Sequence, residues 1–166
     1  MEIVSTRSFL DYWGKVHGRT RRLLDHLPPE HIDWTYGAGK WTVADLVRHL
    51  AALERLMFVE NAYGRKSLYV GCGPDLADGY DAVVAFFDRL NGETVDLLSR
   101  LPDERLSERC ETPGGASLPV WKWLRAMVEH HCHHRGQLYL YLAQLGVTTP
   151  PLYGLTAEEV EARARQ

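Results

Sequence analysis

The chain has 166 residues, of which 45% are hydrophobic and 25% are charged, and its formal net charge is −3 with a pI near 6.2. This length and composition are typical of one soluble globular domain with a hydrophobic core. The slightly acidic balance supplies no strong positive field, so we expect no binding to nucleic acids. No apolar run reaches 18 residues, so we expect no membrane span.

Cysteine usage and the start of the chain predict the compartment. The three cysteines, Cys72, Cys110 and Cys132, are an odd number without the spacing of a disulfide framework. Residues 1–4 lack the basic region and the long apolar run of a signal peptide. We therefore expect a cytoplasmic protein in a reducing environment.

The first predicted helix carries apolar residues at helical spacing, with Ser5 or Thr6 as its N-cap. It is expected to end at Pro28-Pro29, because proline disfavours helical geometry in the residue before it. His17 and His26 have no matching partner nearby in the sequence, and we expect both at the surface.

A second helix is predicted from Thr42, since Asp45 three residues later completes a capping box. Its apolar stripe consists of Val43, Leu46, Val47, Leu50, Leu53 and Met57. His49 lies beside this stripe. Alone it is as readily a hydrogen-bonded core residue, but a neighbouring helix could use it as a third imidazole.

Two further helices follow a glycine-containing loop at residues 64–77. The third helix has Asp78 or Asp81 as its expected cap, and Leu101-Pro102 is expected to stop it. After a connector at residues 103–115, we expect Ser117 to cap the fourth helix, with Pro119 in its first turn.

The fourth helix is expected to stop at Gly146, and the charged segment 156–166 is expected to form a marginal exposed helix or a frayed end. No segment shows convincing alternation of period two, so no strand is expected. The sequence thus predicts an all-α four-helix bundle with long connectors, as a single domain over residues 1–155 with a short tail at residues 156–166.

Four of the eight histidines fall in five consecutive positions, His130 to His134, within the fourth helix. Residues four apart share a helix face, so His130 and His134 can coordinate one metal ion. With about 100° per residue from His130, His134 falls at about 40°, inside the apolar arc. His133 falls at about −60°, outside the arc, and His131 at about 100°, inward but away from His130. The alternative is that the inward histidines are only core residues.

Several stretches resemble the DinB-like family of small four-helix metalloenzymes. They are Lys40-Trp41-Thr42-Val43-Ala44-Asp45-Leu46-Val47-Arg48-His49-Leu50, then Glu129-His130 and His133-His134-Arg135-Gly136-Gln137-Leu138, and finally Gly146 with Pro150-Pro151-Leu152-Tyr153. The resemblance implies one metal-binding histidine from the second helix and two from the last. Those residues here are His49, His130 and His134. It also implies a homodimer. Members of this family include enzymes that transfer low-molecular-weight thiols, so the resemblance implies that activity as one possibility here.

Three imidazoles leave coordination positions free for water or substrate, which is typical of a catalytic site. Zinc or nickel is the expected divalent ion, ahead of iron or copper. The predicted function is a metal-dependent hydrolase or thiol transferase acting on a small molecule, such as a low-molecular-weight thiol. The alternatives are a non-catalytic bundle stabilised by a metal and a plain interaction scaffold.

The residues around the histidines have weaker predictions. We expect Gln137, at about −20° on the helix, to line the pocket. Gly136 is expected to allow close helix packing, and Arg135 to pair with an acid elsewhere. Glu54 and Glu60 could support the ligands through hydrogen bonds, although such residues are more often solvated. The sequence shows no convincing general base.

Overall fold

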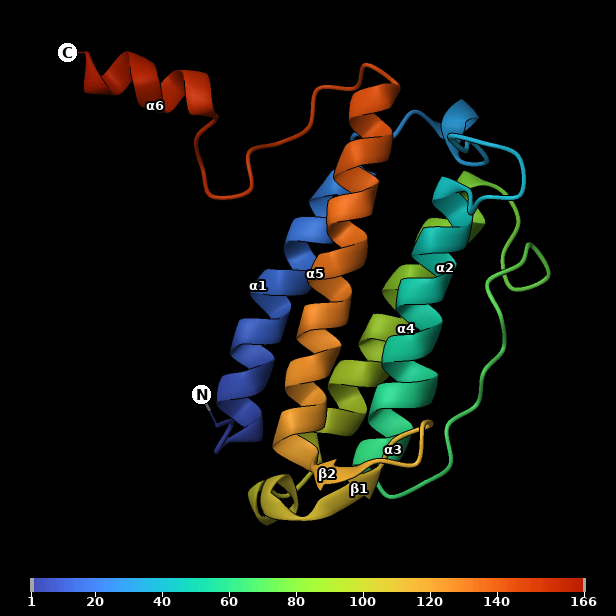
Figure 1. The fold of residues 1–166 in the computed structure, drawn as a ribbon, viewed down its shortest axis with the longest axis vertical. Coiled ribbons are helices and arrows are strands. Elements are labelled where there is room, and N and C mark those ends of the chain that lie inside the picture. The colour runs from blue at the N-terminus through green and yellow to red at the C-terminus, as the bar shows by residue number, and fades with distance from the viewer. Residues whose placement is uncertain (1, 166) are drawn as a thin grey trace.

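In the computed structural model, which describes residues 2–165, four long helices lie side by side (Figure 1). They are α1 (Thr6–Leu24), α2 (Val43–Leu53), α4 (Tyr80–Ser99) and α5 (Val120–Gln144). This arrangement confirms the predicted all-α four-helix bundle. The shorter elements are the 3₁₀ helices η1 (Pro29–His31) and η3 (Asp103–Ser107), the π-helix η2 (Glu54–Val59), α3 (Glu60–Ala62), α6 (Ala157–Ala164), and strands β1 (Arg109–Glu111) and β2 (Ser117–Pro119).

The apolar faces of the helices form two clusters of buried side chains. One joins the end of α1 to α2, the first half of α4 and the end of α5, with Leu50 and Phe87 fully buried. The other joins the start of α1 to η2, the end of α4 and the start of α5, with Trp13 and Leu124 fully buried. Burial of these stripes is the main favourable contribution to the fold, as it is for amphipathic helices in general.

The capping box predicted at the start of α2 is confirmed. The Asp45 amide donates to the Thr42 hydroxyl over 3.0 Å, and the Thr42 amide donates to the Asp45 carboxylate over 2.9 Å. The two bonds satisfy amides that have no partner within the helix. The position of α2, and therefore of His49, is fixed in part by this cap.

We expect Thr42→Ala to lower the free energy of unfolding by about 1 kcal/mol, because an amide of the first turn loses its acceptor. Thr156→Ala is the matched control, since Thr156 forms the same motif with Glu159 at the start of α6. Helix α6 has no buried residue, so the control should leave global unfolding unchanged. Chemical denaturation of both variants measures the difference, and equal effects would contradict this account of the cap.

The first helix begins as expected, but it ends at Leu24 and not at Pro28-Pro29, and one of its histidines is misplaced by the prediction. Ser5 is the N-cap, and its hydroxyl accepts from the Ser8 amide over 3.4 Å. His26 is exposed, as expected. His17 is not at the surface: it is 6% exposed, and its ring stacks on Phe87 of α4 with centroids 4.4 Å apart. Its positions relative to Trp13 and Thr20, four back and three on, place it on the buried face.

The caps expected for the third and fourth helices are wrong. Helix α4 begins after Gly79, which has φ 80° and no side-chain cap, so neither Asp78 nor Asp81 is the cap. The left-handed backbone at this position suits glycine. Helix α5 begins after Pro119, which is its N-cap, and Ser117 belongs to strand β2.

A small antiparallel sheet, not expected from the sequence, connects η3 to α5. Strands β1 and β2 pair Arg109 with Pro119, Cys110 with Leu118, and Glu111 with Ser117. Each strand has only three residues, which is too short for an alternating pattern to stand out. The hairpin closes the end of the bundle where α5 begins (Figure 1).

The end of α5 agrees with the helix stop that the sequence predicts at Gly146. Gly146 has φ 71°, and the Val147 amide donates to the Leu142 carbonyl over 2.9 Å, which is the arrangement of a glycine helix stop. Helix α6 projects away from the bundle (Figure 1). Within residues 2–165, no helix is long and apolar enough to cross a membrane. The division into a domain at residues 1–155 and a tail at 156–166 stays a prediction.

Candidate metal centre

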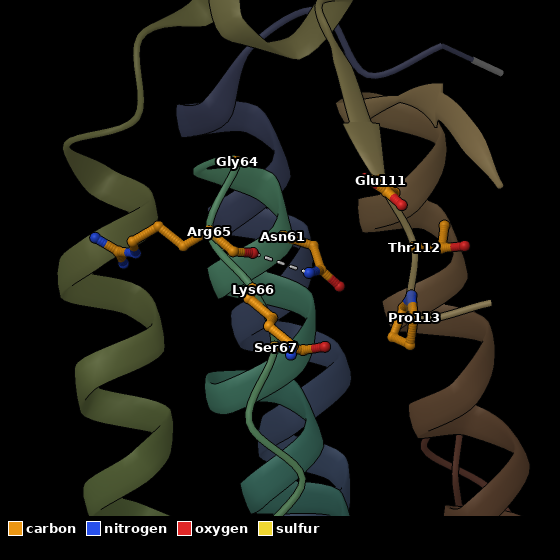
Figure 2. Close-up of a pocket in the computed structure, with 8 residues that line it drawn as sticks. All are labelled: Asn61, Gly64, Arg65, Lys66, Ser67, Glu111, Thr112 and Pro113. Atoms are coloured by element: carbon orange, nitrogen blue, oxygen red, sulfur yellow. Dashed lines mark hydrogen bonds between the residues drawn. The ribbon is translucent and has the colours of Figure 1, made fainter. Parts of the chain in front are cut away.

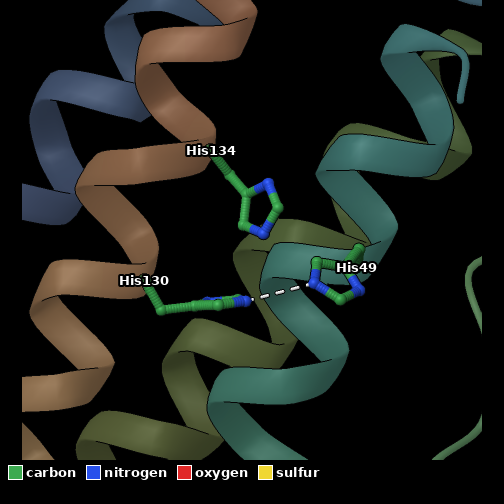
Figure 3. A group of neighbouring side chains, drawn as sticks. All are labelled: His49, His130 and His134. Carbon is green, nitrogen blue, oxygen red and sulfur yellow. Dashed lines mark hydrogen bonds between the residues drawn. The ribbon is translucent and has the colours of Figure 1, made fainter.

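Three histidines from two helices meet inside the bundle (Figure 3). His49 comes from α2, and His130 and His134 come from successive turns of α5. One ring nitrogen from each lies within 4.8 Å of the others, and Nε2 of His49 is 3.1 Å from Nε2 of His130. The structure therefore places His130 and His134 side by side, and metal binding by them stays a prediction. His49 joins them as the resemblance implied.

Aromatic side chains surround the three imidazoles. The Trp41 ring lies 4.6 Å from the His49 ring and 6.1 Å from the His134 ring, measured between centroids. The Tyr141 hydroxyl donates to the Trp41 carbonyl over 3.1 Å, which ties Trp41 to α5. These contacts place aromatic surface against His49 and His134.

Burial lowers the pKa of all three histidines. Desolvation, with a smaller contribution from His134, lowers the pKa of His49 from 6.5 to about 4. Desolvation and the neighbouring histidines lower the pKa of His130 to about 3, and desolvation also lowers the pKa of His134. The rings are therefore neutral at pH 7, which is the form that binds a metal ion.

The donor set fits a divalent metal ion. Two nitrogens held tetrahedrally at about 2.0–2.1 Å from one zinc lie about 3.3 Å apart, close to the observed 3.1 Å. Nδ1 of His134 donates to the Gln137 side-chain oxygen over 2.7 Å, which leaves the lone pair of its Nε2 available to coordinate a metal. Among the described residues, Nδ1 of His49 and Nδ1 of His130 are buried without a hydrogen-bond partner, so neither ring has the supporting bond that Gln137 gives to His134.

We expect Gln137→Ala to weaken metal binding about 10-fold, because Gln137 fixes the ring orientation and tautomer of His134. Gln144→Ala, an exposed change near the end of the same helix, is the control and should leave the affinity unchanged. Competition with a chromophoric chelator measures both affinities. An unchanged affinity in the Gln137 variant would remove this residue from the site.

A small cavity adjoins the cluster, and it supports the expectation that Gln137 lines a pocket. Its volume is about 340 Å³, and its lining is Tyr36, Gly39, Lys40, Trp41, Leu46, His134, Gln137 and Tyr141. No carboxylate appears in this lining. A small ligand in the cavity would reach His134 directly.

Two larger cavities lie elsewhere. One of about 540 Å³ is formed by residues near the end of α3 and by residues of β1 and its following turn (Figure 2). Another of about 610 Å³ lies between the N-terminal segment and α5. Neither is lined by His49, His130 or His134, so size alone does not identify the site. The smaller cavity is the one that meets a group able to hold a metal.

Two expectations for the residues after the histidines are wrong. Arg135 is buried and donates to the Val16 carbonyl over 3.2 Å and to Cys132 Sγ over 3.4 Å, with no acid bonded to it among the described residues. Gly136 faces open space, because a Cβ atom there would meet nothing within 4 Å. It therefore serves no close helix packing.

The two glutamates of the second helical stretch have different environments. Glu60 pairs with Arg55 and Arg65 over 2.5 Å each. Glu54 is 1% exposed and bonds to His131, a contact that sequence reasoning missed. Glu54 and His131 each lie on a buried helix face. Helical periodicity shows that each face is buried, but it does not show that the two faces contact each other.

The buried histidines predict acid sensitivity of the metal-free protein. Desolvation lowers the pKa of His17 to about 4 and that of His131 to about 3, whereas burial raises the pKa of Glu54 to about 8. Each histidine contributes stability that is fully present above pH 6.5. This contribution is lost as the pH falls toward the pKa of that histidine in the folded state. The contribution of Glu54 to stability depends on pH in the opposite direction, and it is lost as the pH rises toward 8.

The histidines outnumber Glu54, so we expect the metal-free protein to lose at least about 1 kcal/mol per pH unit between pH 6 and pH 5. Denaturant titrations at several pH values measure this slope. His17→Gln should make the slope smaller, because it removes one buried group that takes up a proton on unfolding. A free energy of unfolding that stays constant from pH 7 to pH 5 would contradict the neutral, buried state of these rings.

The fold and the three-histidine cluster together define a helical bundle with a potential metal site. A model of the DinB family matches residues 3–165, and the chain belongs to this family. A DinB-like protein from Bacillus cereus has a similar structure, with a TM-score of 0.77 and 22% identity over 89% of this chain and 97% of that chain.

Two further structures are similar in fold. YfiT from Bacillus subtilis, known as a probable metal-dependent hydrolase with an unusual four-helix bundle topology, has a TM-score of 0.68 and 16% identity over 89% of this chain and 93% of that chain. A mycothiol-dependent maleylpyruvate isomerase has a TM-score of 0.62 and 18% identity over 81% of this chain and 60% of that chain. At these identities the similarity establishes the fold.

Proposed function

We propose that His49, His130 and His134 bind one divalent metal ion and that the protein is a metal-dependent enzyme acting on a small molecule. The observation that carries the proposal is the convergence of three neutral imidazole nitrogens within 4.8 Å, a group in which residues 2–165 place no fourth protein donor. A site of three protein ligands keeps coordination positions for water or substrate, whereas structural zinc sites are closed by four.

Zinc or nickel is the ion we propose, with iron or copper as alternatives, because imidazole nitrogen suits all of them. When bound, such an ion supplies a Lewis acid that can polarise a carbonyl or favour the anionic form of a bound water or thiol. The protein's own part is to hold the three ligands, to orient His134 through Gln137, and to pack the Trp41 ring against His49.

Two reaction classes remain for this site, hydrolysis and thiol transfer. The relationship in fold to a probable metal-dependent hydrolase supports the first, and the relationship to a mycothiol-dependent enzyme supports the second. The cavity beside His134 has room for a small molecule, such as a low-molecular-weight thiol. The alternative is a non-catalytic bundle in which the ion only joins α2 to α5.

Loading the protein with cobalt(II) and adding a small thiol or azide separates an open site from a closed one. Because the site has three protein ligands, we expect a visible absorption spectrum that changes saturably as the added anion binds. A spectrum that does not respond to either anion, in protein that holds one cobalt per chain, would support a structural ion instead. A positive result justifies a screen of ester, amide and thiol-transfer substrates.

The resemblance also motivates a homodimer, and large exposed side chains such as Tyr12 and Tyr69 are compatible with one. Light scattering during gel filtration tests this state directly. We further propose that residues 1–155 fold without residues 156–166, because α6 buries no residue. Truncation after Leu155 should leave the thermal transition unchanged.

A further inference from the structure

A second polar cluster lies in the core of the bundle, beside the three histidines but separate from them. It brings together His17 and Thr20 from α1, Glu54 at the start of η2, and His131 from α5. None of these side chains is more than 6% exposed. Buried polar groups are costly unless they are paired, so a cluster of four in a core of this size requires an explanation.

His131 is held at both of its ring nitrogens. The Glu54 carboxyl group lies 2.5 Å from Nδ1, and the Thr20 hydroxyl lies 2.6 Å from Nε2. The Trp13 ring packs against the same imidazole in a T-shaped arrangement, with centroids 5.0 Å apart and an interplanar angle of 79°. The ring therefore has one orientation, fixed from α1 on one side and from η2 on the other.

The sequence connects this clamp to the candidate metal centre. His131 directly follows His130, and the two side chains leave α5 about 100° apart. Glu54 follows His49 by five residues on the same continuous helical stretch. The α2–η2 stretch and α5 therefore meet at two neighbouring polar contacts, His49 with His130 and Glu54 with His131.

Helix geometry gives the distance by which a rotation of α5 would displace the ligand nitrogens. A histidine Nε2 lies about 6 Å from its helix axis, so a rotation of α5 by about 10° moves it by about 1 Å. Metal–ligand distances tolerate about 0.2 Å. A clamp that limits the rotation of α5 can thus decide whether His130 and His134 both reach an ion held by His49.

We propose that Glu54 and His131 are positioning residues for the three-histidine site, because their bond sets the rotation of α5 against α2 and η2. The inference rests on the proposed metal binding, and it adds that the metal affinity depends on Glu54 and His131, which are outside the group of three histidines. If the pair were only a stabilising core contact, a folded variant lacking it would bind metal as the parent does.

The test compares Glu54→Ala and Glu54→Gln with Leu98→Ala, a core change near the end of α4 whose side chain is 1% exposed. Zinc affinity is measured by chelator competition at a temperature where circular dichroism shows each variant folded, and cobalt(II) spectra report coordination geometry. We expect Glu54→Ala to weaken binding at least 10-fold and to alter the spectrum. Glu54→Gln should recover most of the affinity, because its amide can still bond to His131.

Leu98→Ala should lower the melting temperature without changing affinity or spectrum. Thr20→Val, which removes the other contact of His131 at nearly constant volume, provides a second variant in case Glu54→Ala does not fold, and it too should weaken binding. Parent-like affinity and spectrum in folded Glu54→Ala or Thr20→Val would overturn the positioning role while leaving the metal site intact. A parent protein that binds no zinc would overturn both proposals.

Discussion

We expect His134→Ala to weaken metal binding by about 100-fold or more, because it removes one of three protein ligands. Loss of a residue that only supports a ligand already costs about 10- to 100-fold in comparable sites. The remaining pair, His49 and His130, would hold the ion with two nitrogens, which is too few for a stable site at micromolar metal. Chelator competition with zinc or cobalt measures the change.

His133→Ala is the matched control for this prediction. His133 is the adjacent histidine on the same helix, but it is exposed and outside the group of three. The control should lose far less affinity than His134→Ala, although the His133 ring lies 3.4 Å from the Gln137 side-chain nitrogen, and it thus tests for a general effect of removing a histidine from α5. Equal losses in both variants, or no loss in His134→Ala, would contradict the assigned ligand set.

The second large effect is on stability. Trp13→Ala should lower the free energy of unfolding by about 3–5 kcal/mol, because its side chain is fully buried and the change leaves a large cavity. The Trp13 ring contacts Phe9 and His131, and its N–H donates to the Asn91 side chain over 3.1 Å. Denaturant unfolding at pH 7.5 measures the loss.

Tyr12→Ala provides the comparison for Trp13→Ala. Tyr12 is the preceding residue of α1 and is 52% exposed, so its removal should cost less than about 1 kcal/mol. A similar loss in the two variants would mean that helix propensity, rather than packing at the centre of the bundle, determines the cost. A small loss in both would show that the core collapses around the missing indole.

The features that the sequence predicts well are those that depend on neighbours along the chain. The His130–His134 pair follows from helical spacing and the apolar arc, and the Thr42 capping box is contained in four residues. The glycine stop at Gly146 is equally local. His49 is different: its place beside α5 depends on helix packing, and the family resemblance rather than spacing indicated it.

The features that were missed depend on contacts between distant segments. The bond between Glu54 and His131 joins residues 77 apart in the chain, and His17 is buried because α4 places Phe87 against it. The hairpin before α5 is stabilised by pairing of two three-residue strands, which leaves no periodic signal. Gly79 begins α4 through its backbone conformation, where a side-chain cap was expected.

Elemental analysis of untagged protein, purified without chelator, tests the central claim most directly. We predict about one equivalent of a divalent transition metal per chain, zinc or nickel, and its loss in a His49→Ala, His130→Ala, His134→Ala triple variant that remains folded. Protein that holds no metal, and takes up none on incubation with zinc or nickel at neutral pH, would contradict the account and leave the three histidines as packing residues.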